Sequence, residues 1–198
     1  MGKRTAASVR PKMVSDRLVL SMPGLEVRAQ KWDYGAGVRD RQVVRLQDSV
    51  VILPITAEGK IVLIKHFRIP TRDGEHWLYE LPAGKIDMLK SGRWERPKRA
   101  AARELSEELG YTAKRLEPLT PGYTTPGKVT EKQFPFIATG LKKGRQHLEL
   151  GEVFAEIIEV TPAKALRMVD NGAIQDYKTQ NLIRAYALRV LKVSAPSR

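Results

Sequence analysis

Short stretches in which hydrophobic and polar residues alternate have the period of two that is typical of β-strands with one buried face. Strands are predicted at three places near the N-terminus and two in the C-terminal half: 17–22, 26–32, 41–46, 134–139 and 153–160. Between these groups, two almost wholly apolar runs flank Glu58-Gly59, a common turn sequence. We therefore expect a hairpin within 49–67 whose strands are covered on both faces.

Three helices are expected from hydrophobic spacing and from helix-end signals. The first covers 96–109, where an early proline does no harm and Gly110 is a natural stop. The second begins at a Thr-Pro pair, suited to an N-cap and first turn, and covers 161–172. The third covers 178–193 and has the apolar repeat of a packing helix. Strands mixed with helices, with few clean βαβ units, predict an α+β fold.

Charge and composition narrow the possible partners. The chain has 35 Lys and Arg against 22 Asp and Glu, a net charge of +13, so we expect an anionic partner: nucleic acid, an anionic membrane or a small phosphorylated substrate. The absence of cysteine excludes disulfides, thiolate zinc sites and cysteine nucleophiles, and an intracellular protein is the natural interpretation.

Two further features of the sequence concern membranes and targeting. No apolar run approaches the roughly 18 residues of a membrane span, so no membrane partner is expected. Residues 1–14 are basic and are not followed by an apolar signal-peptide core. We expect them to form a loose N-terminal tail, with a transit peptide as the alternative.

An unusual group of acids lies within the first predicted helix. Glu104, Glu107 and Glu108 fall within an arc of about 100° and border the apolar stripe of Leu105 and Leu109. Glu104 and Glu108 are four residues apart, and like charges at this spacing destabilise a helix by roughly a few tenths of a kcal/mol. A solvated acidic face paired with nearby arginines is one explanation. The other is a divalent cation, and magnesium prefers such hard oxygen ligands.

The sequence RELSEELGY at 103–111 resembles the end of the Nudix box, G-x5-E-x7-R-E-U-x-E-E-x-G-U, in which U is a bulky aliphatic residue. Glu95, eight residues before Arg103, also matches. The opening glycine does not fall at its usual spacing. Instead, ELPAGKID resembles the segment that opens the box in the ADP-ribose pyrophosphatase branch of the family. Its glycine is Gly84, which implies five inserted residues before Glu95. The similarity continues over roughly residues 40–190.

The resemblance implies a fold and an activity. The expected fold is the Nudix α/β/α sandwich with a mixed sheet over 47–198, preceded by an antiparallel β-element at 15–46 that crosses to the partner of a homodimer. The expected enzyme is cytoplasmic and uses Mg²⁺, or Mn²⁺, to hydrolyse the pyrophosphate of ADP-ribose or a related nucleoside diphosphate sugar. Its products are a nucleoside monophosphate and a sugar phosphate.

The resemblance also assigns catalytic and metal-binding roles. The metal ligands would be three carboxylates and one main-chain carbonyl: Glu104, Glu107, Glu108 and Ala83. Arg103 would orient this cluster by pairing with Glu95, and both Arg103 and Glu108 count among the catalytic residues. The general base would be Glu152, with Glu149 as the second choice, although both also fit the description of surface loop acids.

Substrate-binding residues follow by the same analogy. Arg68 matches the arginine that binds substrate, and a guanidinium fork suits pyrophosphate oxygens. Pro126 lies 15 residues past the box, where a proline marks ADP-ribose hydrolysis in the family. The remaining candidates help to shape the site or contact the nucleoside: Glu80, Glu131, Arg28 and Trp32. Packing and strand-end roles remain the alternative for these residues, above all for Trp32.

Two other functions stay open. The positive charge would suit an enzyme that acts on RNA 5′ ends or on another nucleotide, but no RNA-binding motif supports a nucleic-acid partner. A Nudix domain that senses a nucleotide without cleaving it is the third possibility. Such proteins typically lose box carboxylates, whereas all three glutamates are present here.

Overall fold

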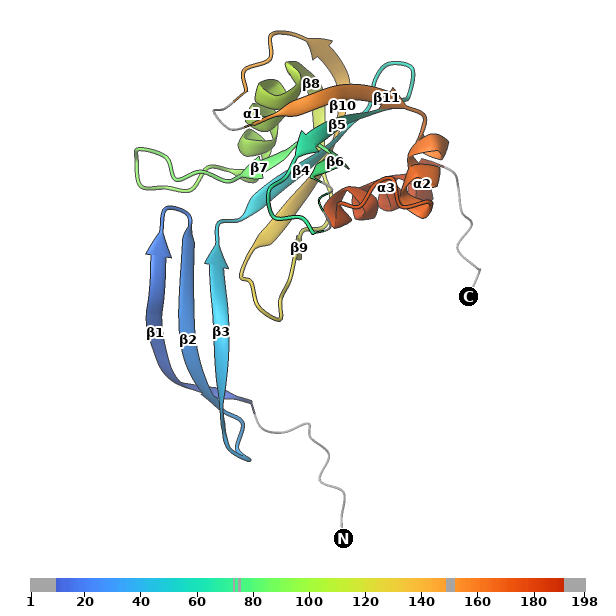
Figure 1. The fold of residues 1–198 in the computed structure, drawn as a ribbon. Helices are drawn as coiled ribbons and strands as arrows, with labels where there is room; N and C mark the ends of the chain where they lie inside the picture. The colour runs from blue at the N-terminus through green and yellow to red at the C-terminus, as the bar shows by residue number, and fades with distance from the viewer. Residues whose placement is uncertain (1–9, 73, 75, 149–151, 191–198) are drawn as a thin grey trace, which may run out of the picture. The chain divides into compact units, whose positions relative to one another are not determined.

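A computed structural model of the chain describes residues 10–72, 74, 76–148 and 152–190 (Figure 1). The chain divides into two compact units. The N-terminal unit comprises Met1–Asp48 and Tyr123–Lys132, and the main unit comprises Ser49–Gly122 and Gln133–Arg198. The predicted boundary between the β-element and the hydrolase domain therefore falls within two residues of the junction at 48/49.

Three antiparallel strands in the order β1-β2-β3 form the N-terminal unit: β1 Lys12–Met22, β2 Leu25–Asp33 and β3 Val38–Leu46. All three predicted strands are confirmed, and each is longer than expected. β1 begins at Lys12, inside the segment expected to be a loose tail, so that boundary was wrong. Lys12 pairs with Asp33 on β2, but β1 is almost wholly exposed. At residues 12–16, main-chain pairing without burial leaves no alternating hydrophobic pattern for sequence analysis to detect.

The segment 123–132 joins the N-terminal unit through β3. The N–H of Val44 donates to the carbonyl of Lys128 at 2.8 Å, and the N–H of Thr130 donates to the carbonyl of Val44 at 3.0 Å. This segment contains Pro126 and Glu131. Two of the predicted substrate residues are thus held by the N-terminal sheet, although they follow the box by many residues.

The main unit contains two sheets. The strands of the first, in spatial order, are β7 Ala83–Lys85, β4 Ser49–Pro54, β10 Lys132–Lys143 and β8 Tyr111–Pro118, with β9 Gly122–Tyr123 beside β10. β4 and β10 are parallel, whereas β7 pairs with β4 and β8 pairs with β10 in antiparallel fashion, so the sheet is mixed, as predicted. The antiparallel second sheet has the order β11 Phe154–Val160, β5 Ile61–Phe67 and β6 Trp77–Glu80.

The predicted hairpin of β4 and β5 was wrong, although both strands exist. They belong to different sheets and are joined only near the turn, by the bridge between Ile55 and Ile61 and by the hydrogen bond from the N–H of Thr56 to the carbonyl of Lys60. β4 takes its hydrogen-bond partners from β7 and β10, and β5 takes its partners from β6 and β11. The prediction that the strands are covered on two faces is confirmed for all of β4 and for the first four residues of β5, because these residues are buried.

Helices cover both sides of these strands, as Figure 1 shows. The predicted helices are confirmed as α1 Pro97–Leu109, α2 Pro162–Asp170 and α3 Tyr177–Val190. Residues of β4 alternate between two hydrophobic clusters. Val50 and Ile52 pack with α1, and Val51 and Leu53 pack with α2 and α3. Within the described part of the chain, every helix is too short or too polar to cross a membrane.

Candidate active site

Helix α1 carries the acidic cluster at the edge of the core. It ends at Gly110, whose φ of 68° is easily adopted only by glycine. Glu104 and Glu108 lie one turn apart and retain only 6% and 1% of their exposure. Gly84 in β7 packs directly against this turn, since a Cβ there would lie 2.0 Å from the carboxyl group of Glu104. The glycine proposed to open the box therefore contacts the acidic helix.

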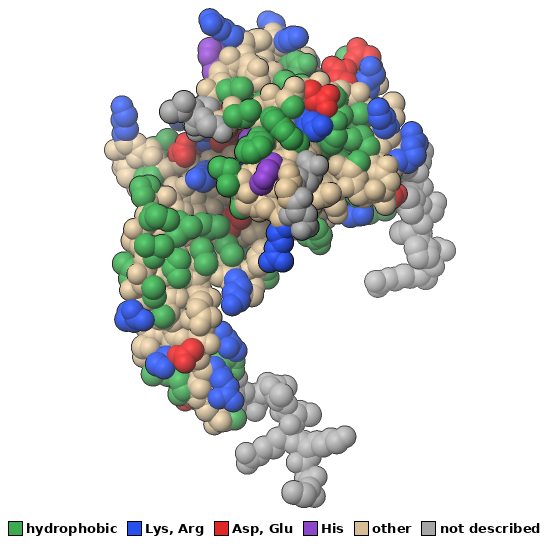
Figure 2. Space-filling view, in the orientation of Figure 1, with side chains coloured by type: hydrophobic (Ala, Val, Ile, Leu, Met, Phe, Trp, Pro, Cys, Tyr) green, Lys and Arg blue, Asp and Glu red, His purple; other side chains and the backbone are tan. Residues whose placement is uncertain are grey.

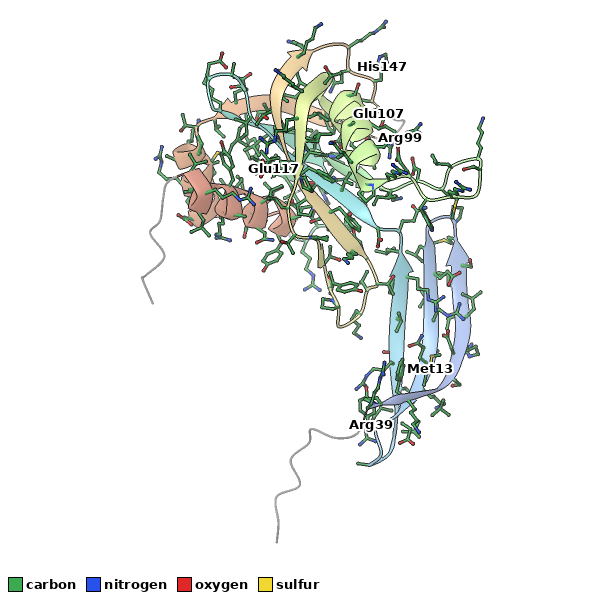
Figure 3. All side chains as sticks on the ribbon, turned by 180° about the vertical axis from the view of Figure 1, so that it is seen from behind. Met13, Arg39, Arg99, Glu107, Glu117 and His147 are labelled. Atoms are coloured by element: carbon green, nitrogen blue, oxygen red, sulfur yellow. The ribbon has the colours of Figure 1, made fainter. Side chains whose placement is uncertain are left out.

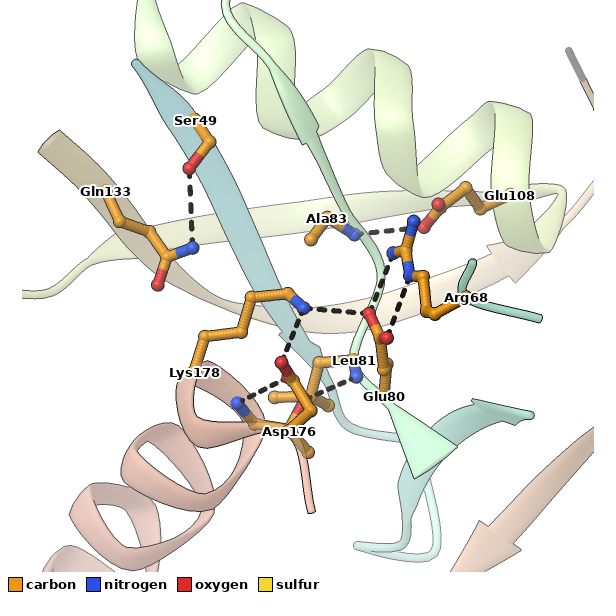
Figure 4. Close-up of polar contacts among 10 residues, drawn as sticks. Ser49, Arg68, Glu80, Leu81, Ala83, Glu108, Gln133, Asp176 and Lys178 are labelled. Carbon is orange, nitrogen blue, oxygen red and sulfur yellow. Dashed lines mark hydrogen bonds and ion pairs between the residues drawn. The ribbon is translucent and has the colours of Figure 1, made fainter. Parts of the chain in front are cut away.

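The environment of Glu104 and Glu108 disfavours two negative charges. Burial raises the pKa of Glu104 to about 7, although Arg103 acts in the opposite direction. Burial, and then the charge of Glu104, raise the pKa of Glu108 well above its ordinary value. The N–H of Ala83 donates to Glu108 Oε2 at 3.0 Å (Figure 4). A cation between these carboxylates would remove a repulsion that the protein itself only partly offsets.

Arg103 is the centre of the hydrogen bonds around the cluster. Its Nη1 donates to Glu104 at 2.7 Å and to Glu107 at 3.0 Å, and its Nη2 donates to Glu95 at 3.1 Å. The predicted pairing of Arg103 with Glu95 is confirmed. Glu95 is buried, so this contact fixes the guanidinium from the side away from the glutamates.

The inserted residues form a small loop that leaves Glu95 in place. Met88 and Trp94 form a β-bridge, and the N–H of Glu95 donates to the carbonyl of Asp87 at 2.8 Å. Met88 and Trp94 are both about half exposed. The extra residues thus form a loop that projects outward and whose two ends, at Asp87 and Glu95, are hydrogen-bonded to each other.

The donor set fits a hard divalent cation, although the side chains are not arranged around one. Among the described residues, no three His, Cys, Asp or Glu side chains are grouped closely enough to hold a metal ion as they stand. Glu104 and Glu107 each accept a hydrogen bond from Arg103 instead. Buried carboxylates with raised pKa values and few N–H donors are nevertheless suitable ligands for magnesium. Binding would require Glu104 to turn away from Arg103 or to be shared with it.

A cavity of about 380 Å³ lies beside the acidic helix. It brings together four predicted site residues: Arg68, Ala83, Glu108 and Glu152. The other lining residues form a mostly apolar wall: His66, Phe67, Ile69 and Pro70.

The pairing of β5 with β11 explains why Arg68 and Glu152 share this cavity. His66 pairs with Phe154, and the N–H of Phe67 donates to the carbonyl of Val153 at 3.0 Å. Because the strands are antiparallel, the residue after β5 meets the segment before β11.

Burial, followed by the charge of Arg68, lowers the pKa of His66 to about 4, so this imidazole is neutral at pH 7.

Glu80 supports Arg68 from outside the cavity lining. Arg68 donates from Nε and Nη2 to the two carboxylate oxygens of Glu80 at 2.9 and 2.8 Å (Figure 4). Lys178 of α3 donates to the same carboxylate at 2.8 Å. Burial alone would raise the pKa of Glu80, but the contacts with Arg68 and Lys178 prevail and lower it to about 2. Sequence analysis missed Lys178, which lies 98 residues away in a helix that showed only a packing pattern.

The remaining predicted residues lie elsewhere. Arg28 pairs with Asp16 and Glu26 in the N-terminal unit, and Trp32 Nε1 donates to Gln30 at 2.9 Å. Also in that unit, Glu131 accepts a hydrogen bond from Thr124 at 2.9 Å, and Pro126 is exposed. Glu149 lies outside the described residues. Four of these five residues therefore belong to the N-terminal unit, whereas the cavity is lined by residues of the main unit.

The loop that leads toward Glu152 is tied to the end of α1. The N–H of His147 donates to the carbonyl of Glu107 at 3.0 Å, and Figure 3 labels both residues. Gln146 Nε2 donates to the carbonyl of Glu108. His147 is thus a loop residue whose main chain caps the acidic helix.

A model of the NUDIX domain matches residues 45–180, and the chain belongs to the Nudix family. It is 39% identical over 154 residues to the ADP-ribose pyrophosphatase of Bacillus subtilis (strain 168), covering 77% of this chain and 76% of that protein. It is 31% identical over 161 residues to the GDP-mannose pyrophosphatase of Yersinia pestis (strain Pestoides F), covering 78% of each. A solved structure of an ADP compounds hydrolase covers 94% of this chain and 98% of that chain, with a TM-score of 0.76 and 18% identity, which shows a shared fold.

Proposed function

We propose that this Nudix protein hydrolyses the pyrophosphate bond of ADP-ribose or a related nucleoside diphosphate sugar with the help of magnesium or manganese. The observation that carries the proposal is that Arg68, Glu108 and Glu152 line one cavity beside the buried acidic helix. The relatives named for ADP-ribose and GDP-mannose pyrophosphatase activity support this class of substrate. A cytoplasmic location remains a prediction from the sequence.

The carboxylates of α1 form the proposed metal site. Glu104, Glu107 and Glu108, with the main-chain carbonyl of Ala83, would hold the ion. When bound, a divalent cation neutralises pyrophosphate charge and polarises a phosphoryl oxygen. Arg103 keeps the carboxylates in position through its contacts with Glu104 and Glu107.

Two residues of the cavity act on the substrate and on water. Arg68 binds the diphosphate, because its N–H groups match phosphate oxygens in charge and geometry. Glu152 accepts a proton from the attacking water on a carboxylate oxygen, since it shares the cavity with Glu108. Glu149 is the second choice for this base.

The N-terminal unit would contribute to nucleoside binding and to dimer formation. Arg28, Trp32, Pro126 and Glu131 are the proposed contacts. In Figure 2, hydrophobic side chains gather over the N-terminal strands. An apolar surface on such strands favours a homodimer in which this element reaches the partner subunit.

A substrate panel tests the proposed reaction. ADP-ribose, GDP-mannose, UDP-glucose and a triphosphorylated RNA are each incubated with Mg²⁺, with Mn²⁺ and with a chelator, and the products are separated by chromatography. We expect AMP and ribose 5-phosphate from ADP-ribose, and no turnover with the chelator. Nucleotide sugars that stay intact with both metals would contradict the proposal, and cleavage of RNA alone would favour an enzyme that acts on RNA ends.

A pair of glutamate variants separates catalysis from folding in the same assay. Glu108→Gln should lower kcat by at least about 100-fold, because it removes a charge that is needed at the metal. Glu117→Gln is the matched control, since Glu117 is a partly exposed residue of β8 that pairs with Arg115 and Arg189. Both variants should retain the melting temperature of the wild type within a few degrees, roughly. Binding of nucleotide sugar without turnover in the wild type would indicate a sensing protein.

A further inference from the structure

The start of α3 holds the end of β6 at two consecutive residues. Lys178 Nζ donates to Glu80 Oε2 at 2.8 Å, and Thr179 Oγ1 accepts the N–H of Leu81 at 2.9 Å (Figure 4). Thr179 is fully buried and Glu80 is 3% exposed. The contact is therefore part of the packed interior rather than a surface ion pair, and it joins parts of the chain 98 residues apart.

Lys178 is itself fixed in one orientation. Its Nζ also donates to Asp176 Oδ1 at 2.8 Å. Asp176 in turn accepts the N–H and the hydroxyl of Thr179 at 3.0 and 2.5 Å, as a residue that caps a helix N-terminus does. The ammonium group thus has a defined position between two carboxylates, and its own side chain is largely buried.

Glu80 transmits this position to Arg68. Its two oxygens accept Nε and Nη2 of Arg68 in a fork, which fixes the plane of the guanidinium as well as its distance. Oε2 serves both Arg68 and Lys178, so Glu80 is held from two sides. If Arg68 were its one cationic partner, the Glu80 carboxylate could rotate together with that arginine. The ammonium group of Lys178 restrains this rotation.

The shared carboxylate also affects charge at the cavity. A closed pair of Arg68 with one glutamate would cancel the charge that attracts a diphosphate. Because Glu80 is divided between two cations, Arg68 keeps more of its positive charge toward the cavity that it lines with Glu108. Its Nε and one Nη2 hydrogen are used by Glu80, and among the described residues no other acceptor takes its remaining N–H groups, which can donate to phosphate oxygens.

We propose that Lys178 is a positioning residue for substrate binding, which acts through Glu80 to hold the guanidinium of Arg68 toward the pyrophosphate. The inference rests on the proposed function, because it takes Arg68 as the group that contacts the substrate. A purely structural lysine would neutralise Glu80 without affecting how Arg68 binds. The two roles differ in whether the effect of Lys178 depends on Arg68.

A double-mutant cycle on Lys178 and Arg68 makes this distinction. Lys178→Met keeps most of the length of the side chain and removes its charge. We expect the KM for ADP-ribose to rise about tenfold, the loss expected for a weakened hydrogen bond to a charged group, with kcat changed less than about twofold. Lys178→Arg should restore most of the affinity. In an Arg68→Gln background, Lys178→Met should change KM by less than about twofold.

The controls separate a loss of folding from a loss of positioning. Lys164→Met, at an exposed position of α2, should match the wild type in KM and melting temperature. If Lys178→Met does not fold, Lys178→Gln, which keeps a hydrogen-bond donor, takes its place in the cycle. An equal rise in KM with Arg68 present and with Arg68 replaced would overturn the inference and leave Lys178 a structural residue.

Binding of ADP, measured by calorimetry in the presence of magnesium, runs the same cycle without turnover. If the wild type binds ADP but cleaves no nucleotide sugar, the proposed function is wrong. The positioning role is still tested in that case, because it requires that the effect of Lys178→Met on ADP affinity depends on Arg68. If the wild type cleaves ADP-ribose but the effects of the Lys178 and Arg68 substitutions on ADP affinity are additive, only the positioning role is overturned. A wild type with neither turnover nor ADP binding overturns both.

Discussion

At the scale of single residues, the missing side chain of Gly84 determines where Glu104 lies. The carboxyl group of Glu104 occupies the space that a Cβ at Gly84 would take, at a distance of 2.0 Å. The backbone of Gly84 is outside the left-handed region, so other residues can adopt its conformation. Glycine is therefore required here by the close approach of the carboxylate and not by the fold of the loop.

Gly84→Ala should separate metal binding from stability. The obstacle is the flexible end of Glu104, which can move aside. The free energy of unfolding should therefore change by no more than about 1 kcal/mol, because alanine suits this backbone. The displaced carboxylate should raise the magnesium concentration needed for half-maximal activity by about 10- to 100-fold. A magnesium titration of turnover and a thermal melt measure the two effects.

Gly122→Ala is the matched control for this experiment, since nothing lies within 4 Å of a Cβ built there. It should leave both the magnesium titration and the melt unchanged. An unchanged magnesium requirement in Gly84→Ala would mean that the position of Glu104 is not needed for metal binding.

Individual site residues differed in how far the sequence could predict them. The three glutamates and Arg103 are neighbours in one helix, so their spacing alone placed them together. Lys178 meets Glu80 only because α3 packs across the end of β6. That contact depends on tertiary packing, and a lysine within an apolar helical repeat gives no local sign of it.

At the scale of elements, the loop between β7 and α1 shows how an insertion can leave a site intact. The loop begins and ends at residues that are already hydrogen-bonded, since the N–H of Glu95 donates to the carbonyl of Asp87. Removing 89–93 would join Met88 directly to Trp94. The four residues from Asp87 to Glu95 would then have the hydrogen bond of an ordinary β-turn, in which the N–H of the fourth residue donates to the carbonyl of the first.

A variant that lacks 89–93 should therefore fold and keep its activity. With Trp94→Gly added to suit a two-residue turn, we expect kcat/KM within about threefold of the wild type, because Glu95 would still reach Arg103. The single variant Trp94→Gly is the control for the lost side chain. If the shortened protein folds with a normal melt but loses turnover, the loop itself takes part in the reaction.

The element types were predictable, but some of their pairings were not. The two apolar runs were correctly identified as strands covered on both faces. Their placement as a hairpin was wrong because each could also pair with other apolar strands, and local pattern does not rank these choices. The length of β1 was underestimated for a different reason. Its pairing with β2 buries almost none of its side chains, so burial gave no signal for its first residues.

At the scale of the whole molecule, the two compact units differ in how completely they are covered. The main unit has a two-sided core, with helices on both faces of its strands. In the N-terminal unit, one face of the sheet contains apolar residues of all three strands, since Leu20 pairs with Val27 and Val27 pairs with Val44. Leu20 and Met22 are 46% and 51% exposed. A second copy of the chain would remove this apolar surface from water.

Replacement of these exposed residues by lysine tests the proposed homodimer. We expect the wild type to have about twice the 22.3 kDa mass of one chain by light scattering, and Leu20→Lys with Met22→Lys to be a monomer, because buried charge disfavours association. Ser21→Lys is the control, since Ser21 pairs with Glu26 on the opposite face of the sheet.

If the N-terminal unit also contributes Arg28 or Trp32 to the partner's substrate site, the monomeric variant should have a raised KM with an unchanged melt of the main unit. A wild type that is monomeric at all measured concentrations would rule out the dimer, and a monomeric variant with the KM of the wild type would show that each chain holds a complete site.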